Sequence, residues 1–189
     1  MSNGYKNNPE QELDERIINI ERVATVVKGG RRFSFRVTMV AGDHKGKVGM
    51  GIGKANSVPD AIRKAASKAK DHMHQVSLYN TTIPHKVMGQ VSGAKVLLKP
   101  ASEGTGVIAA GSVRAVVEVS WISNILTKSL GSNNAMNIAA ATINGLDQLK
   151  DPYEEAANRG VDPELLIPFW DRDEGQNHGK EEKDIHVEN

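Results

Sequence analysis

Lys28-Gly29-Gly30-Arg31 separates two stretches that are rich in β-branched residues and phenylalanine, 18–27 and 32–41. Adjacent glycines between two such stretches are typical of a β-hairpin, because tight hairpin turns need residues that tolerate positive φ. In the second stretch, the apolar residues Phe33, Phe35, Val37 and Met39 alternate with the polar residues Arg32, Ser34, Arg36 and Thr38. Alternation predicts a strand with one face in the core and one basic face. The sequence therefore predicts a hairpin with a basic tip.

A third strand and a helix are predicted to complete this first unit. A turn over 42–46 leads to a strand over 47–52, and apolar residues then recur at helical spacing over 57–75. Ser57 or Asn56 is a suitable cap for this helix, and Pro59 suits its first turn. We expect three antiparallel strands packed against one helix.

A second α/β unit is predicted after a linker. Strands are expected over 86–91, 95–98 and 121–126, with a glycine-rich loop over 104–111, a helix over 114–119, a longer helix after the cap at 132–134 and a last short helix that ends at Gly160. The expected fold class is α+β with two domains. The expected division is a flexible arm over 1–12, an RNA-binding domain over 13–78, a linker over 79–84, a C-terminal α/β domain over 85–160 and an acidic, disordered extension over 161–189.

Charge is unevenly distributed along the chain, although the formal net charge is only +1. Residues 1–21 carry −3, residues 22–70 carry +10, residues 71–150 carry +2 and residues 151–189 carry −8. A segment as rich in Lys and Arg as residues 22–70 is typical of a surface that neutralises phosphates. RNA contact is therefore the predicted function of the first unit.

The hairpin tip by itself fits an ordinary solvated turn as well as it fits an RNA contact. The other cations of the first unit favour RNA, because they accompany glycines whose backbone can approach a phosphate closely. The residues predicted to contact RNA are Arg22, Lys28, Gly29, Gly30, Arg31, Arg32, Arg36, Lys45, Lys47, Lys54, Arg63, Lys64 and Lys68.

Two glycine-rich segments invite a nucleotide-binding interpretation. The segment 49–54 lacks the spacing of the P-loop and of the dinucleotide motif, so its alternate glycines favour close packing or a bulge in a strand. The loop over 104–111 loosely resembles the phosphate loop of small-molecule kinases of the galactokinase–homoserine kinase type. Val107 and Ile108 stand where those kinases carry serines. A kinase remains the rival hypothesis from the enzyme class.

Composition excludes further classes of function. Without cysteine the chain has no disulfide, thiolate metal ligand or thiol nucleophile, and its histidines form no HExxH pair. The sequence has no apolar run of about eighteen residues that would cross a membrane. We expect a cytosolic, non-enzymatic protein without a metal, cofactor or small-molecule substrate. Its histidines are expected to be solvated, and Trp121 is expected in the core or at an interface.

Several blocks, taken in order, resemble the bacterial and organellar family of small ribosomal subunit protein five. The resemblance covers about residues 13–160. The blocks are Arg22-Val23, Val27-Lys28-Gly29-Gly30-Arg31, Phe33-Ser34-Phe35, Val48-Gly49-Met50-Gly51, Lys54-Ala55, Pro100-Ala101-Ser102-Glu103-Gly104-Thr105-Gly106 and Gly131-Ser132-Asn133-Asn134.

The resemblance implies a first domain like the double-stranded-RNA-binding fold and a β-α-β second domain related to those kinases. It implies binding to small-subunit ribosomal RNA near the central pseudoknot, contacts with ribosomal proteins four and eight, and a position along the messenger RNA path of cytoplasmic ribosomes. The loop 28–31 matches a hairpin implicated in the response to spectinomycin, and Arg22 matches a basic residue near the messenger path.

The resemblance also implies a protein interface. Gly106 and Arg114 match positions linked to decoding accuracy at the contact with protein four, and Gly104 belongs to the same loop. The chain departs from the family in its net charge and in its acidic end from about residue 165. A third hypothesis is a free-standing regulator that binds double-stranded RNA away from the ribosome.

Overall fold

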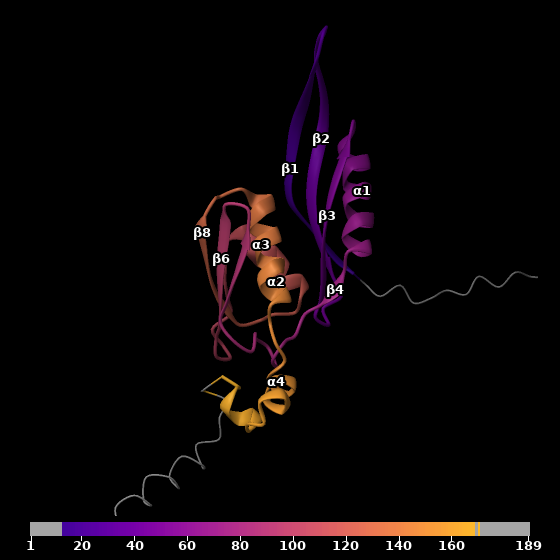
Figure 1. Ribbon diagram of the computed structural model, residues 1–189. Coiled ribbons are helices and arrows are strands. Elements are labelled where there is room, and N and C mark those ends of the chain that lie inside the picture. The colour runs from indigo at the N-terminus through magenta and orange to yellow at the C-terminus, as the bar shows by residue number, and fades with distance from the viewer. Residues whose placement is uncertain (1–12, 169, 171–189) are drawn as a thin grey trace, which may run out of the picture.

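The computed structural model describes residues 13–168 and residue 170 as two β-sheets with four α-helices (Figure 1). The predictions for 1–12 and for 171–189 lie outside the described residues. The elements are β1 (Asp14–Val27), β2 (Gly30–Gly42), β3 (Lys47–Ala55), α1 (Val58–Asp71), β4 (His74–Gln75), β5 (Val87–Val91), β6 (Ala94–Pro100), β7 (Val107–Ile108), α2 (Gly111–Val119), β8 (Ile125–Gly131), α3 (Ala135–Asp147), α4 (Pro152–Arg159) and a 3₁₀ turn (Pro163–Leu165). The sheets have the orders β1-β2-β3-β4 and β5-β6-β8-β7. The predicted α+β fold class is confirmed.

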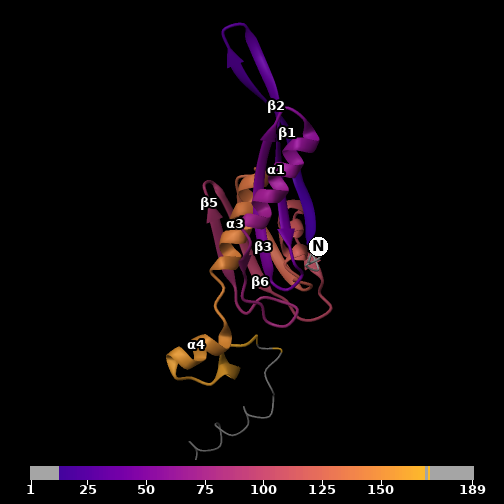
Figure 2. The same ribbon diagram turned by 90° about the vertical axis from the view of Figure 1, so that its right-hand side faces the viewer.

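The long hairpin is formed by β1 and β2, which pair antiparallel up to Val27 opposite Gly30. Gly30 has a φ of 139°, so a glycine is required at the turn. On its other side, β2 pairs with β3 only as far as Phe35 opposite Ala55. The tip of the hairpin therefore extends beyond β3 and α1, as Figures 1 and 2 show.

Backbone contact between α1 and β3 explains the alternate glycines of 49–54. A Cβ atom on Gly51 would lie 2.0 Å from the carbonyl oxygen of Ala65, and one on Gly53 would lie 2.0 Å from that of Ala61. Both alanines are fully buried. Small residues on both elements thus let the helix lie directly on the strand, which confirms the packing interpretation of these glycines.

Helix α1 is shorter than predicted. It begins after the Ser57 cap, whose side chain accepts a hydrogen bond from the Asp60 amide, but it ends at Asp71 and not at 75. His74 and Gln75 instead form β4, which pairs with the start of β3. Apolar spacing could not reveal this end, because pairing with another strand overrides the local helical pattern. The first sheet consequently has four strands and not three.

Both faces of β2 are buried from Val37 onward. Helix α1 covers one face, and α2 of the second unit covers the other, where a Cβ atom on Gly42 would lie 2.1 Å from the Val119 carbonyl oxygen. Val40 and Ile83 share one hydrophobic cluster with the second unit. The expectation of a core face and a basic face therefore fails from Val37 onward, where neither face is exposed.

The predicted linker, 79–84, is a packed connection. Ile83 is fully buried, and the Thr82 hydroxyl accepts a hydrogen bond from the Ala101 amide at 3.2 Å. Because this segment belongs to the shared core, the two units form one packed body in the structure.

The second sheet contains the predicted β-α-β unit, in which α2 connects the paired parallel strands β7 and β8. Helix α3 packs against β5 and β6.

Two predicted boundaries of the second unit are wrong: α2 begins at Gly111, and the strand predicted over 121–126 lies at Ile125–Gly131. The chain turns first at Trp121, which has a φ of 70°. Trp121 is 58% exposed and forms a T-shaped contact with the His44 ring. Of its two expected places the core is therefore wrong, and an interface stays a prediction.

Helix α4 lies at the opposite end of the molecule from the hairpin (Figure 2). It ends at Gly160 with a φ of 66°, as predicted. Hydrogen bonds donated by Arg159 and Lys150 hold the pKa of the Glu155 carboxyl below its usual value. The chain remains folded beyond the helix, because Ile167 and Pro168 are buried. The structure thus differs from the disorder expected of residues 161–168.

Replacing Gly51 with alanine is expected to destabilise the fold by about 1–3 kcal/mol or more, because the new Cβ atom meets backbone and not a movable side chain. Urea unfolding measures the loss. Gly29→Ala is the matched control: no atom lies within 4 Å of its Cβ position, and the change should stay within about 0.5 kcal/mol. Equal stability of the two variants would contradict the packing described for α1 and β3.

Candidate nucleic-acid interface

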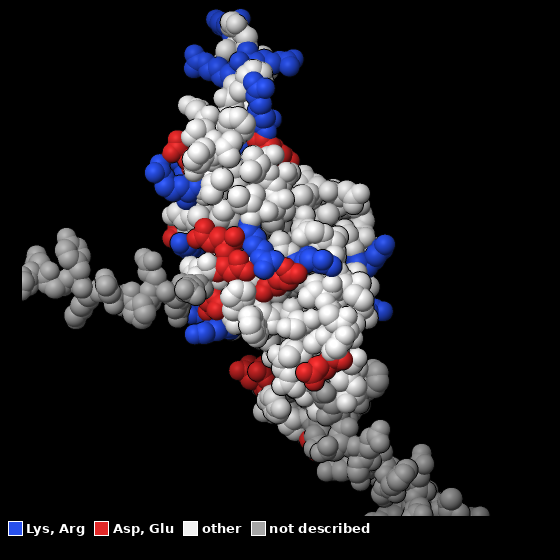
Figure 3. Space-filling view, turned by 180° about the vertical axis from the view of Figure 1, so that it is seen from behind, with Lys and Arg blue, Asp and Glu red and all other residues white. Residues whose placement is uncertain are grey.

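The hairpin tip is a cluster of exposed cations. Lys28, Arg31 and Arg32 are exposed, and no atom lies within 4 Å of a Cβ position on Gly29 or Gly30. In Figure 3 the tip carries basic side chains without acidic ones, whereas a belt of both signs crosses the middle of the molecule. A phosphate can therefore approach both the cations and the bare backbone of the turn.

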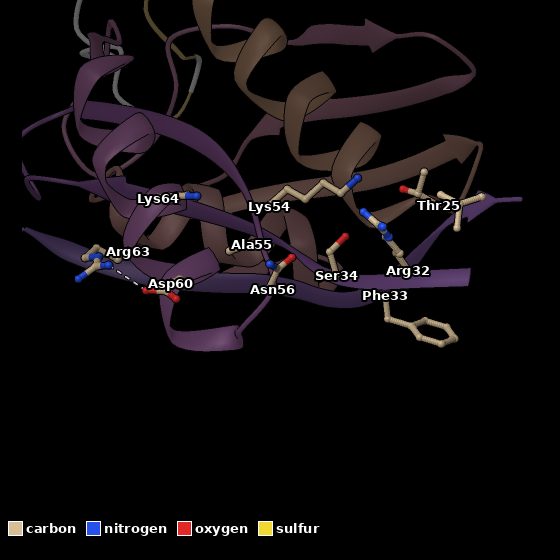
Figure 4. A pocket seen from close by; sticks show the side chains of 11 residues that line it. Thr25, Arg32, Phe33, Ser34, Lys54, Ala55, Asn56, Asp60, Arg63 and Lys64 are labelled. Carbon is tan, nitrogen blue, oxygen red and sulfur yellow. Dashed lines mark hydrogen bonds and ion pairs between the residues drawn. The ribbon is translucent and has the colours of Figure 1, made fainter. Parts of the chain in front are cut away.

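A hollow of about 760 Å³ lies below the tip, where β2 extends past the end of β3. We call it the hairpin notch. Figure 4 shows Arg32, Ser34 and Lys54 on one side of the strands, and Phe33 pointing away on the other. The residues that line the notch are Thr25, Val27, Arg32, Phe33, Ser34, Lys54, Ala55, Asn56, Asp60, Arg63 and Lys64.

A second hollow, of about 520 Å³, follows the outer edge of β3. Its lining residues are Arg36, Ile52, Gly53, Lys54, Lys64, Ser67 and Lys68. Lys54 and Lys64 also line the hairpin notch. The two hollows therefore form one continuous surface between the upper sheet and α1, which we call the basic groove.

Cations of the basic groove differ in how far acids neutralise them. Arg36 forms an ion pair with Glu21 on β1, and Arg63 pairs with Asp60 at 2.8 Å. Among the described residues, no carboxylate is within ion-pair distance of Arg32, Lys54 or Lys64. The same is true of Lys68, so these four side chains are the cations of the groove that are free to meet an anion.

Arg36 and Lys54 also lie directly opposite each other on β2 and β3. Like charges in such cross-strand positions destabilise a sheet. Glu21 lies opposite Arg36 on its other side and offsets part of this repulsion. An anion bound between the two cations would offset the rest of the repulsion between them.

The structure separates some of the predicted RNA contacts from the groove. Lys45 lies in the turn after β2 and Lys47 is the first residue of β3, both at the end of the sheet away from the hairpin tip. Their amides donate to the Asp43 carboxylate at 2.9 Å. Arg22 lies over the Phe33 ring at 3.7 Å from the ring centroid. The groove and tip bring together the other cations: Lys28, Arg31, Arg32, Arg36, Lys54, Arg63, Lys64 and Lys68.

Sequence reasoning missed the exposure of Phe33, which was assigned to the core. Its side chain is 49% exposed, because neither β3 nor α1 extends high enough to cover it. Thr25 and Asn56 were missed as well. Alternation along β2 gave the correct side for each residue, but it carried no information about where β3 ends.

The predicted protein interface is an exposed loop before α2. Gly104 and Gly106 have φ values of 85° and 75°, and open space surrounds their Cβ positions. Buried Asn124 fixes the loop from below: its side chain accepts from the Gly106 amide and donates to the Thr81 hydroxyl, both at 2.9 Å. Arg114 donates to the Val107 carbonyl oxygen at 3.2 Å. The structure thus brings Gly104, Gly106 and Arg114 together.

The loop over 104–111 and the start of α2 lack the form of a kinase phosphate loop. Val107 and Ile108 form β7, and helix α2 has no side-chain cap. In the part of the chain that the structure describes, no cluster of three His, Asp or Glu side chains is placed to bind a metal ion. Across the same residues, no helix combines the length and apolar character needed to span a membrane.

Three histidines are in contact with other groups and not simply solvated as expected. His74 pairs with Asp147 at 2.5 Å, and His44 lies 3.4 Å from Asp14. His85 accepts a hydrogen bond from the Lys150 amide at 3.1 Å. His72 is exposed, while His178 and His186 lie outside the described residues.

Each of the two domains matches a known protein family model. The family model for the N-terminal domain of ribosomal protein S5 matches residues 13–77, and the model for its C-terminal domain matches residues 89–159. Small ribosomal subunit protein uS5 of Thermotoga maritima is 55% identical over 157 residues, which are 83% of this chain and 88% of the relative. The proteins of the same name from Thermotoga petrophila and Pseudothermotoga lettingae are 54% and 52% identical over the same shares. The chain therefore belongs to the ribosomal protein S5 family.

Proposed function

We propose that this protein fastens small-subunit ribosomal RNA through the hairpin tip and the basic groove. Membership of the family makes the chain a structural protein of the small ribosomal subunit and not an enzyme. The observation that carries the RNA proposal is a row of cations without acidic partners along one continuous groove: Arg32, Lys54, Lys64 and Lys68.

Binding works by neutralising phosphates and by fitting the shape of RNA. Each cation near a phosphate releases counterions, which makes the affinity depend on salt. The edge of β2 between 30 and 34 has no strand beside it, so its backbone groups are also available. A phosphate near Arg36 and Lys54 would lower the repulsion between them. Such contacts hold the RNA in place without selecting a base sequence.

The loop that contains Gly104 and Gly106 serves a neighbouring ribosomal protein. Its glycines are open to solvent, the adjacent Ile108 is 53% exposed, and Asn124 holds the backbone in one shape. A fixed and partly apolar surface suits a protein partner better than a phosphate backbone. Protein four is the proposed partner here. We also propose contact with ribosomal protein eight, a position along the messenger RNA path, support of decoding accuracy and a cytoplasmic location.

The rival hypotheses predict different behaviour. A free-standing regulator of double-stranded RNA would not sediment with small subunits, whereas this protein should sediment with them and leave only in a stripping salt wash. A kinase would show a higher melting temperature when ATP is added, and this protein should not.

Arg31→Glu is expected to weaken binding to small-subunit ribosomal RNA and to lower the slope of log K against log salt by about 1, since one phosphate contact is lost. Filter binding across a salt series measures both quantities. Lys86→Glu is the matched control, because it makes the same charge change at an exposed position of the second domain. An unchanged slope in Arg31→Glu would remove that residue from the phosphate contacts.

Asn124→Ala is expected to cost about 1–3 kcal/mol, since it leaves the partly buried Gly106 amide and Thr81 hydroxyl without their partner. Amide hydrogen exchange over 102–108 should accelerate at the same time. Asn133→Ala, at an exposed position, should change neither quantity. Unaltered exchange in the Asn124 variant would show that the loop is held by something else.

A further inference from the structure

The hairpin carries apolar side chains in solvent above α1. Phe33 is 49% exposed and Val26 is 76% exposed. Ala24, directly opposite Phe33 in the register, is exposed as well. Residues opposite each other and those two positions apart share a face of the hairpin, so these three side chains form an apolar strip, which Arg22 and Arg31 flank on the same face. Within residues 13–168, no element covers it (Figure 1).

The Phe33 ring is held in place by a cation. The Arg22 guanidinium carbon lies 3.7 Å from the ring centroid, the geometry of a cation–π contact. Figure 4 shows the ring on the opposite side of the strands from Arg32, Ser34 and Lys54, with open space beyond it. One flat surface of the ring is thus supported by Arg22, while a large part of the ring remains accessible.

Charges around the ring restrict what can cover it. Lys28, Arg31 and Arg32 lie on the same hairpin, and Glu21, which precedes Arg22 in the chain, is paired with Arg36. An apolar segment of another protein would gain nothing from these cations. A nucleotide matches both features, because its base is flat and apolar on its faces and its phosphate is anionic.

We propose that Phe33, supported by Arg22, is a stacking platform for an unpaired base of the small-subunit RNA. The inference rests on the proposed RNA function and makes it more specific. Bases inside an A-form helix are already stacked and inaccessible, so the occupant is a base in a loop, a bulge or a strand end. The hairpin therefore binds phosphates with its cations and receives one exposed base against the ring of Phe33.

Phe33→Leu tests the platform, since leucine keeps an apolar side chain but lacks a π surface. Binding of the full chain to small-subunit ribosomal RNA transcribed from the Thermotoga maritima gene is measured across a salt series. We expect a roughly 5- to 100-fold loss of affinity with an unchanged salt slope, because stacking releases no counterions. Phe33→Tyr should retain the affinity, and Val26→Ala should lower it by less than Phe33→Leu. Urea unfolding verifies that the exposed substitutions leave the fold intact.

Ultraviolet crosslinking gives a second readout on the unmodified chain. Stacked aromatic side chains crosslink to bases, so mass spectrometry should find a nucleotide attached to Phe33. Wild-type affinity in Phe33→Leu, together with no adduct at Phe33, would overturn the platform. If the salt slope still falls in Arg31→Glu, only the platform fails; if that slope is unchanged as well, the proposed RNA function fails with it.

Discussion

Contact between the backbone of α1 and the glycines of β3 determines the geometry of the basic groove. Gly51 and Gly53 place the helix directly on the strand, with the carbonyl oxygens of Ala65 and Ala61 where side chains would otherwise stand. A helix held farther away would separate Lys64 from Lys54, which now line the same two hollows. A feature without any charge thus sets the spacing of the cations.

The shared core extends this rigidity through the rest of the molecule. Because α2 covers the lower part of β2 and Ile83 is buried between the units, the groove and the glycine-rich loop belong to one packed body. Interiors packed in this way transmit small displacements and do not absorb them. The chain therefore holds the basic groove and the glycine-rich loop, for which we propose RNA and protein partners, at a fixed separation, which suits a protein that joins neighbours in an assembly.

Local patterns were sufficient for much of the fold and for most of the groove. The glycine pair gave the hairpin, and alternation gave the side of β2 on which Arg32 and Arg36 lie. Features set by distant contacts could not be predicted. The end of α1 depends on the pairing of β4, and the burial of Thr38 depends on α2. The exposure of Phe33 could not be predicted either, because it depends on where β3 ends.

The upper hairpin accepts features that a sheet selected only for stability would avoid. It places Arg36 opposite Lys54 and leaves Phe33 and Val26 in solvent. Like charges across strands and exposed apolar strips both have a cost in the isolated protein. The packed lower half, where both faces of β2 are buried, supplies the stability that the upper half lacks. Repulsion between cations and unburied apolar surface are both relieved by a bound polyanion with exposed bases. The division of β2 into a stable base and an unsatisfied tip is therefore what an RNA anchor requires.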